Sequence, residues 1–261
     1  MRNIWSIWQK ELKLFFVSPI AYVMLTIFLL LTGFFFRSIV VRVVEFAIQE
    51  MIQAQQFGGP PPARDLTQDV VRAFFGVLST IILFLLPMLT MGVFADEKRR
   101  GTIELLMTSP VTHWQVILGK FFASLSFYVL MLLPTSLLML FVYRYSDPRI
   151  AWKPVLSAYV GIFLLGMVLI SIGIFISSLT ENQIVAAVIT FTIFILLWVI
   201  DFAAQGAGVL SEIMRYMSVL THYEDFSKGV IDTKSLIFYG SLTVLGLFLT
   251  SSSVESMRWR E

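Results

Sequence analysis

Six long apolar stretches without a charged side chain constrain the fold of this chain more than any other feature of its sequence. An α-helix rises about 1.5 Å per residue, so about 20 apolar residues cross the hydrocarbon of a bilayer. With 57% hydrophobic and 14% charged residues, the 261-residue chain has too much apolar surface for a water-soluble domain. We therefore predict an all-α polytopic membrane protein, one domain over 1–261. Its six transmembrane helices are expected near Ile20–Phe36, Ala73–Phe94, Phe121–Tyr143, Val155–Thr180, Asn182–Ile200 and Ser235–Val254.

The distribution of cations predicts the orientation of these helices. Six spans place both termini on the same side of the membrane. That side carries the one dense basic cluster, Lys98-Arg99-Arg100, close to the end of a span. Lysine and arginine are enriched in cytoplasmic loops, so we expect both termini in the cytoplasm of a multi-pass inner-membrane protein. The residues before the first span contain no short apolar core of the kind found in cleavable signals.

Residues 1–18 have the pattern of an amphipathic helix. At 100° per residue, apolar side chains such as Ile7, Trp8 and Phe15 share one broad face, and polar residues lie opposite. Such a helix lies in the membrane interface, and Ser18-Pro19 then breaks it, because the residue before a proline is disfavoured in a helix. Glu11 alone falls on the apolar side, which favours a protein contact there.

The sequence lacks the groups that most membrane enzymes and carriers need. There is no phosphate-binding loop, no cysteine and no H-E-x-x-H pair, and the two histidines are His113 and His222. The six spans contain no Asp, Glu, Lys, Arg or His, which ion-coupled carriers usually hold at mid-membrane. The net charge of +2 gives no indication of nucleic-acid binding. We therefore expect no catalytic residue, metal or cofactor on this chain, and an energy source elsewhere.

The segment 96–110, after the second span, is the richest in turn and capping residues. Gly101 is expected to end the charged helix, and Thr102 to cap a short helix whose first turn holds Glu104. Leu105 and Leu106 give this helix an apolar surface. Two interpretations stay open: the helix rests on its own bundle, or it is a rigid knob that docks into a soluble partner.

Two segments are expected outside the membrane on the other side. The first contains Phe57-Gly58-Gly59-Pro60-Pro61-Pro62, a flexible and then stiff linker. The second, 205–234, contains four candidate contact residues. These side chains either meet a substrate or an extracytoplasmic partner, or belong to a re-entrant helix pair that plugs the bundle. The four are His222, Tyr223, Phe226 and Asp232.

In combination, several segments of this chain resemble the permease subunits of ABC-2 type exporters, most closely the gliding-motility-associated branch. Residues 11–22 resemble the amphipathic elbow and the entry to the first helix in that family. Glu97–Pro110 resembles its coupling segment and is followed by Leu118-Gly119-Lys120-Phe121. Residues 177–183 are similar to its second cytoplasmic turn, and 222–232 to its outer segment before the last helix.

The resemblance implies that a separate cytoplasmic ABC ATPase dimer, carrying ATP and Mg, binds this chain. The chain would then be the membrane-spanning half of an exporter and would work beside a second copy or a related permease in the bilayer. A gliding-motility-like complex would add a membrane subunit with a large extracytoplasmic domain, and could transmit force without moving a solute. The implied ATPase contacts are Glu97, Gly101, Thr102, Glu104, Leu105 and Leu106, with a lesser contact through Thr180, Glu181 and Asn182.

Overall fold

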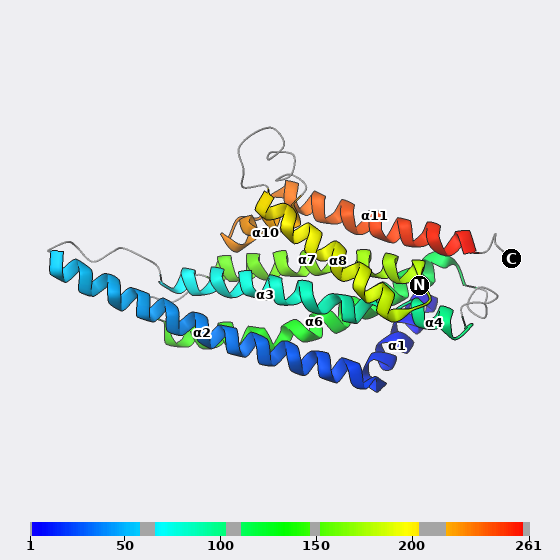
Figure 1. Cartoon of the computed structure of the whole chain (residues 1–261), viewed down its shortest axis with the longest axis horizontal. Coiled ribbons are helices and arrows are strands. Elements are labelled where there is room, and N and C mark those ends of the chain that lie inside the picture. The colour runs from blue at the N-terminus through cyan, green and yellow to red at the C-terminus, as the bar shows by residue number, and fades with distance from the viewer. Residues whose placement is uncertain (1, 58–65, 103–110, 147–151, 204–217, 258–261) are drawn as a thin grey trace.

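The computed structural model of the chain describes residues 2–57, 66–102, 111–146, 152–203 and 218–257, and within these ranges all regular secondary structure is helical. The long helices run roughly side by side in one elongated bundle (Figure 1). The helices are α1 (Arg2–Val17), α2 (Pro19–Phe57), α3 (Leu66–Thr90), α4 (Ala95–Arg99), α6 (His113–Tyr145), α7 (Trp152–Leu179), α8 (Gln183–Ala203), α10 (Val219–Ser227) and α11 (Thr233–Met257).

Six of these helices are long and apolar enough to cross a membrane, which confirms the predicted all-α polytopic class. They are α2, α3, α6, α7, α8 and α11. In α7, 67% of the most apolar window is buried inside the protein, against 17% in α8. The helix α7 packs against α3, α6, α8, α10 and α11, so it is the centre of the bundle.

Small residues along α7 let its neighbours approach closely. Gly166 faces the ring of Tyr128 on α6, and the Tyr128 hydroxyl donates to the Ile162 carbonyl at 2.7 Å. Gly173 lies in the same way against Thr90 of α3. Close backbone approach of this kind is how helices associate in lipid, where burial of apolar surface provides little driving force.

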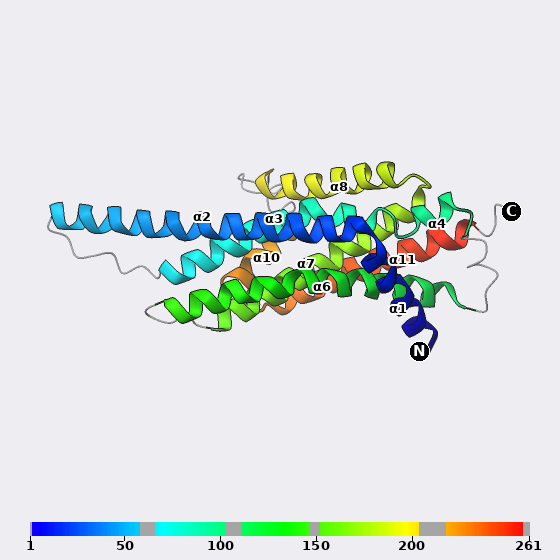
Figure 2. The ribbon, with the colours of Figure 1, turned by 90° about the horizontal axis from the view of Figure 1, so that it is seen from below.

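The helix α2 differs from the predicted first span by its length. It continues through Phe57 rather than ending near Phe36, and it extends beyond the start of α3 and the end of α6 (Figures 1 and 2). Arg42 and Glu45 on this extension are exposed. Charged residues therefore mark where the helix leaves the apolar layer and not where it ends, since Arg and Glu are good helix formers.

The amphipathic segment forms α1 and packs against α6. Trp8 donates through Nε1 to Ser126 Oγ at 2.9 Å, and the rings of Phe15 and Phe127 stack with centroids 5.3 Å apart. Other apolar side chains of α1, Trp5 and Leu14 among them, remain exposed. Figure 2 shows α1 at the same end of the bundle as α4 and the end of α11, which we call the terminal end.

Candidate functional site

The connection between α3 and α4, at the terminal end, is fixed by one serine of α7. The Ser177 hydroxyl donates to the Met91 carbonyl at 2.8 Å and accepts from the backbone N–H groups of Phe94 and Ala95, both at 3.1 Å. The first N–H groups of a helix have no partner within the helix, so Ser177 caps α4 from a neighbouring element. Lys98 adds a second tie, since its ammonium donates to the Ser178 carbonyl at 2.6 Å.

The end of α4 is a tight glycine turn. Gly101 has φ of 67°, a left-handed conformation that glycine adopts without strain. The Gly101 N–H donates to the Lys98 carbonyl and the Thr102 N–H to the Glu97 carbonyl, both at 3.0 Å, which is the Schellman pattern of helix termination. The prediction that Gly101 breaks the charged helix is therefore confirmed.

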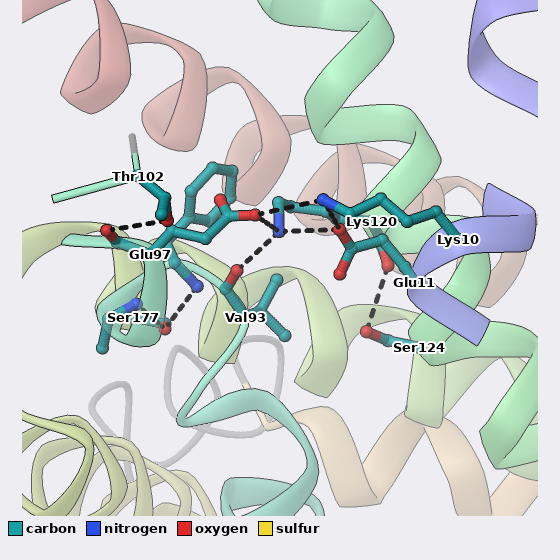
Figure 3. Close-up of polar contacts among 10 residues, drawn as sticks. Lys10, Glu11, Val93, Glu97, Thr102, Lys120, Ser124 and Ser177 are labelled. Atoms are coloured by element: carbon teal, nitrogen blue, oxygen red, sulfur yellow. Dashed lines mark hydrogen bonds and ion pairs between the residues drawn. The ribbon is translucent and has the colours of Figure 1, made fainter. Parts of the chain in front are cut away.

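A buried lysine joins this turn to the rest of the terminal end (Figure 3). The Lys120 side chain, on α6, is 1% exposed, and its Nζ lies 2.9 Å from Glu97 Oε1 and 3.3 Å from Glu11 Oε1. It also donates to the Val93 carbonyl at 2.9 Å and lies 5.2 Å from the centroid of the Phe94 ring. One ammonium group thus connects α1, the α3–α4 connection, α4 and α6.

A second lysine touches the same carboxylates from the surface. Lys10 Nζ lies 3.5 Å from Glu11 Oε1 and 3.9 Å from Glu97 Oε1, but the Lys10 side chain is 57% exposed. Solvent screens such an exposed pair, and its contribution to stability is below about 1 kcal/mol. Lys120 is different, because removing one partner of a buried ion pair leaves an uncompensated charge. We call Glu11, Glu97 and Lys120 the buried triad.

The turn between α7 and α8 lies next to α4 and holds the lesser predicted contact. The Thr180 hydroxyl accepts from the Asn182 N–H at 3.2 Å, and the Asn182 side-chain oxygen accepts from the Ile184 N–H at 2.9 Å. Glu181 and Asn182 are exposed, as are Gly101 and Thr102 on the other segment. Because α4 packs against α7 and α8, the two predicted contact segments share one surface of the terminal end.

Three of the predicted ATPase-contact residues lie outside the described residues, namely Glu104, Leu105 and Leu106. The short helix expected after Thr102 falls in the same range, so its presence stays a prediction.

The four candidate outer residues lie on α10 and just after it. Tyr223 and Phe226 are buried against the bundle: the Tyr223 hydroxyl donates to the Phe75 carbonyl at 3.2 Å, and Phe226 packs on Gly161. Burial raises the pKa of Tyr223 well above its usual range, so this hydroxyl remains a donor. His222 stacks on Phe238, and Asp232 accepts from the Lys234 N–H at 3.0 Å. A contact of these four with an outer partner stays a prediction.

Replacing His222 with alanine is expected to leave the metal content of the purified protein unchanged. Its Nδ1 lies 2.9 Å from the Ser218 carbonyl oxygen, and no group of three or more metal-ligating side chains lies together among the residues that the structure describes. Inductively coupled plasma mass spectrometry of wild-type and His222→Ala protein would check this. Loss of a stoichiometric metal in the variant would identify His222 as a ligand instead.

Sequence reasoning pointed to part of the buried triad. Glu11 was expected to make a protein contact because it lies on an otherwise apolar face, and its pairing with Lys120 confirms that. The sequence predicts no partner for Lys120, which belongs to the segment Leu118-Gly119-Lys120-Phe121 that resembles the ABC-2 family. The signal that could have identified it is a lone cation directly before a long apolar span, matched by a lone carboxylate on the apolar face of another helix.

Known proteins similar to this chain are membrane permeases. A family model described as "ABC-2 family transporter protein" matches residues 5–249. Two curated relatives, from Escherichia coli K12 and O157:H7, are both named "Probable multidrug ABC transporter permease YbhR". Each is 25% identical over 172 residues, which cover 65% of this chain and 45% of the relative. The matched region thus spans less than half the length of these relatives. Neither comparison supports the narrower gliding-motility branch.

Proposed function

Because the chain belongs to the ABC-2 family of transporter proteins, we propose that it is the membrane-spanning permease subunit of an ATP-driven exporter whose ATPase is a separate chain. ATP and Mg²⁺ would bind that ATPase dimer, and this chain would supply no cofactor of its own. It would work in a bacterial inner membrane, with the terminal end in the cytoplasm, beside a second copy or a related permease. Its relatives are described as multidrug permeases, which favours amphipathic small molecules as cargo.

One observation carries this proposal: α4 and the turn between α7 and α8 form one surface at the terminal end, and the buried triad ties that surface to α1 and α6. A surface that receives force from a soluble partner must be connected rigidly to the helices that it moves. The Ser177 hydroxyl provides such a connection to α7, and Lys120 to α6. Ser177 holds the N-terminal end of α4 and Lys120 pairs with Glu97 within it. The exposed residues Gly101 and Thr102 follow directly after this helix.

Closure of the ATPase dimer would then move α3 and α6 together. Each contains a proline inside the helix, Pro87 and Pro134, at which it lacks a backbone hydrogen bond and can bend. Opening and closing of the bundle around these points is the form of motion that we propose for the transport cycle.

A second function, force transmission to an outer partner without movement of a solute, is favoured by α2. This helix extends past α3 and α6 at the end opposite the terminal end and carries exposed apolar side chains there, including Phe46, Ile48 and Met51. A gliding-motility-like complex, with a membrane subunit that has a large extracytoplasmic domain, would use such a helix. Export of a labelled amphiphile from vesicles containing the complex, and its absence without ATP, would favour transport.

Reversal of the charge at Glu104 is expected to uncouple the ATPase from this chain without unfolding it. An arginine in the contact segment would place a cation where the resemblance implies a carboxylate, and we expect at least about a tenfold loss of co-purified ATPase, since like charges placed together across an interface oppose binding by several kcal/mol. The measurement is purification of tagged Glu104→Arg protein in mild detergent, with an assay of ATP hydrolysis.

The matched control is Glu45→Arg, which reverses an exposed carboxylate on α2, about 39 Å along this helix from Pro19. It should retain the ATPase at the wild-type ratio. If Glu104→Arg also retains the ATPase with unchanged activity, the contact assigned to this segment is wrong. If the wild-type chain purifies without any ATPase even after crosslinking, the permease proposal itself fails.

A further inference from the structure

A cavity of about 630 Å³ lies beside the buried triad at the terminal end. Its walls come from the second half of α1, the start of α2, the end of α3 with the α3–α4 connection, α4 and its C-terminal turn, and the starts of α6 and α8. This volume is within the range of ligand pockets in proteins, about 300–1,000 Å³. Neither the surface formed by α4 and the turn between α7 and α8 nor the family match accounts for this cavity.

One part of the cavity is apolar and opens through apolar side chains. Leu14, Ile20 and Met88 line it and are 52%, 46% and 37% exposed. Met24 and Leu89 form its buried wall. An entrance edged by exposed apolar side chains at the end of the membrane-spanning helices admits a molecule from the bilayer more readily than one from water.

The other part of the cavity is charged, and its charges balance. Three cations and three carboxylates line the cavity, so the formal charge of its wall is zero. Within the buried triad the charges already face one another. The more exposed charged groups are Lys10, Arg100 and Asp96; Lys10 also lies near Glu11 and Glu97, and Asp96 Oδ1 lies 3.4 Å from the Arg99 guanidinium. The six charged lining residues are Lys10, Arg100, Lys120, Glu11, Asp96 and Glu97.

Gly92 keeps room for the polar groups of the cavity. A Cβ at this position would lie 3.1 Å from Asp96 Oδ2 and 3.1 Å from Gln183 Nε2, so both side chains lie over a backbone without a side chain of its own. Asp96 and Gln183 both line the cavity, and so place an acceptor and a donor next to each other in its wall.

We propose that this cavity binds one phospholipid with a phosphoethanolamine headgroup from the leaflet at the terminal end. The phosphate lies between Arg100 and Lys10, the ammonium donates to Asp96, and an acyl chain lies against Leu14, Ile20 and Met88. A headgroup with a net negative charge and no ammonium would add an uncompensated charge to a wall whose formal charge is zero and would bring no cation to Asp96. A choline headgroup has the right net charge but no N–H to donate to Asp96.

The test compares lipid retention by native mass spectrometry on the full chain released from detergent. Protein is exchanged into equimolar mixtures of phosphatidylethanolamine with phosphatidylglycerol or phosphatidylcholine of the same chains. We expect one retained phosphatidylethanolamine in preference to the other two. Ile20→Trp fills the entrance and is expected to weaken retention about tenfold, whereas Val23→Trp, at a 53% exposed position of α2 that does not line the cavity, is not.

Asp96→Asn supplies a second variant that leaves the apolar wall intact. We expect it to abolish the preference for ethanolamine over choline, while Ile20→Trp lowers binding of both. Equal retention by Ile20→Trp and Val23→Trp, or no preference among the three headgroups in the wild-type protein, would overturn the proposal. Displacement of the lipid by soluble phosphoethanolamine at equal concentration would also overturn it, because the acyl chain would then contribute nothing. None of these readouts needs the ATPase.

Discussion

Substitution of Lys120 with methionine is expected to lower the free energy of unfolding by about 3–5 kcal/mol, because it breaks a buried ion pair. The Lys120 ammonium is 1% exposed and faces Glu11 and Glu97, whose side chains are only 12% and 16% exposed. Methionine fills a similar volume, so the loss comes from removing the buried cation of two carboxylates, which then have only the exposed Lys10 as a partner. Thermal unfolding in detergent, followed by tryptophan fluorescence, would measure it.

Two controls separate the buried charge from the side chain that carries it. Lys10→Met removes a cation from the same two carboxylates, but at a 57% exposed position, and should change stability by less than about 1 kcal/mol. The triple variant Lys120→Met, Glu11→Gln, Glu97→Gln removes all three buried charges and should recover most of the loss. A triple variant as unstable as the single one would show that packing, and not charge, explains the effect.

The second large effect is expected at Gly166, where an alanine should destabilise the bundle by about 2–3 kcal/mol. A Cβ there would overlap Cε1 and Cζ of the Tyr128 ring and lie 2.8 Å from its oxygen. Tyr128 is fully buried, and its hydroxyl is held by the Ile162 carbonyl at 2.7 Å, so the ring cannot move away without losing that bond. The helices α6 and α7 would have to separate.

Gly76→Ala is the matched control in α3. An added Cβ at Gly76 meets no atom within 4 Å, and alanine favours a helix over glycine by about 0.5–1 kcal/mol. Gly76→Ala should therefore be as stable as the wild type or slightly more stable, whereas Gly166→Ala should be less stable than the wild type. The midpoint temperatures of both variants are measured in the thermal unfolding assay described for Lys120→Met. A Gly166→Ala midpoint at or above the wild-type value would contradict close packing of α6 on α7.

The sequence was sufficient for the spans because apolar length alone decides which segments can cross a bilayer. Each of the six predicted stretches overlaps one of the six helices that are long and apolar enough to do so. The sequence was not sufficient to predict the length of α2. Arg37 and Arg42 mark the end of its apolar part, but the helix continues beyond them. Hydropathy reports the environment of a segment, and here one helix passes through two environments.

The candidate site could be predicted only in part, for a different reason. Gly101 was identified because a local rule of helix termination applies to it. The Ser177 cap and the Lys120 pairs join residues far apart in the chain, and no periodicity in a single sequence reports such contacts. The close approach of α6 to α7 at Gly166 could not be predicted from the sequence either. A single glycine in a helix leaves room for a neighbour, but the sequence does not identify the side chain that packs there.

The unbroken length of α2 has a mechanical consequence. A straight helix of 39 residues is about 58 Å long, nearly twice the thickness of the hydrocarbon layer. Its base lies beside the terminal end and its tip lies beyond the other helices. A rotation of only about 5° about the base sweeps the tip through about 5 Å. Under such a rotation the tip of α2 moves several-fold farther than the residues near its base, so a small tilt at the terminal end becomes a large displacement at the opposite end.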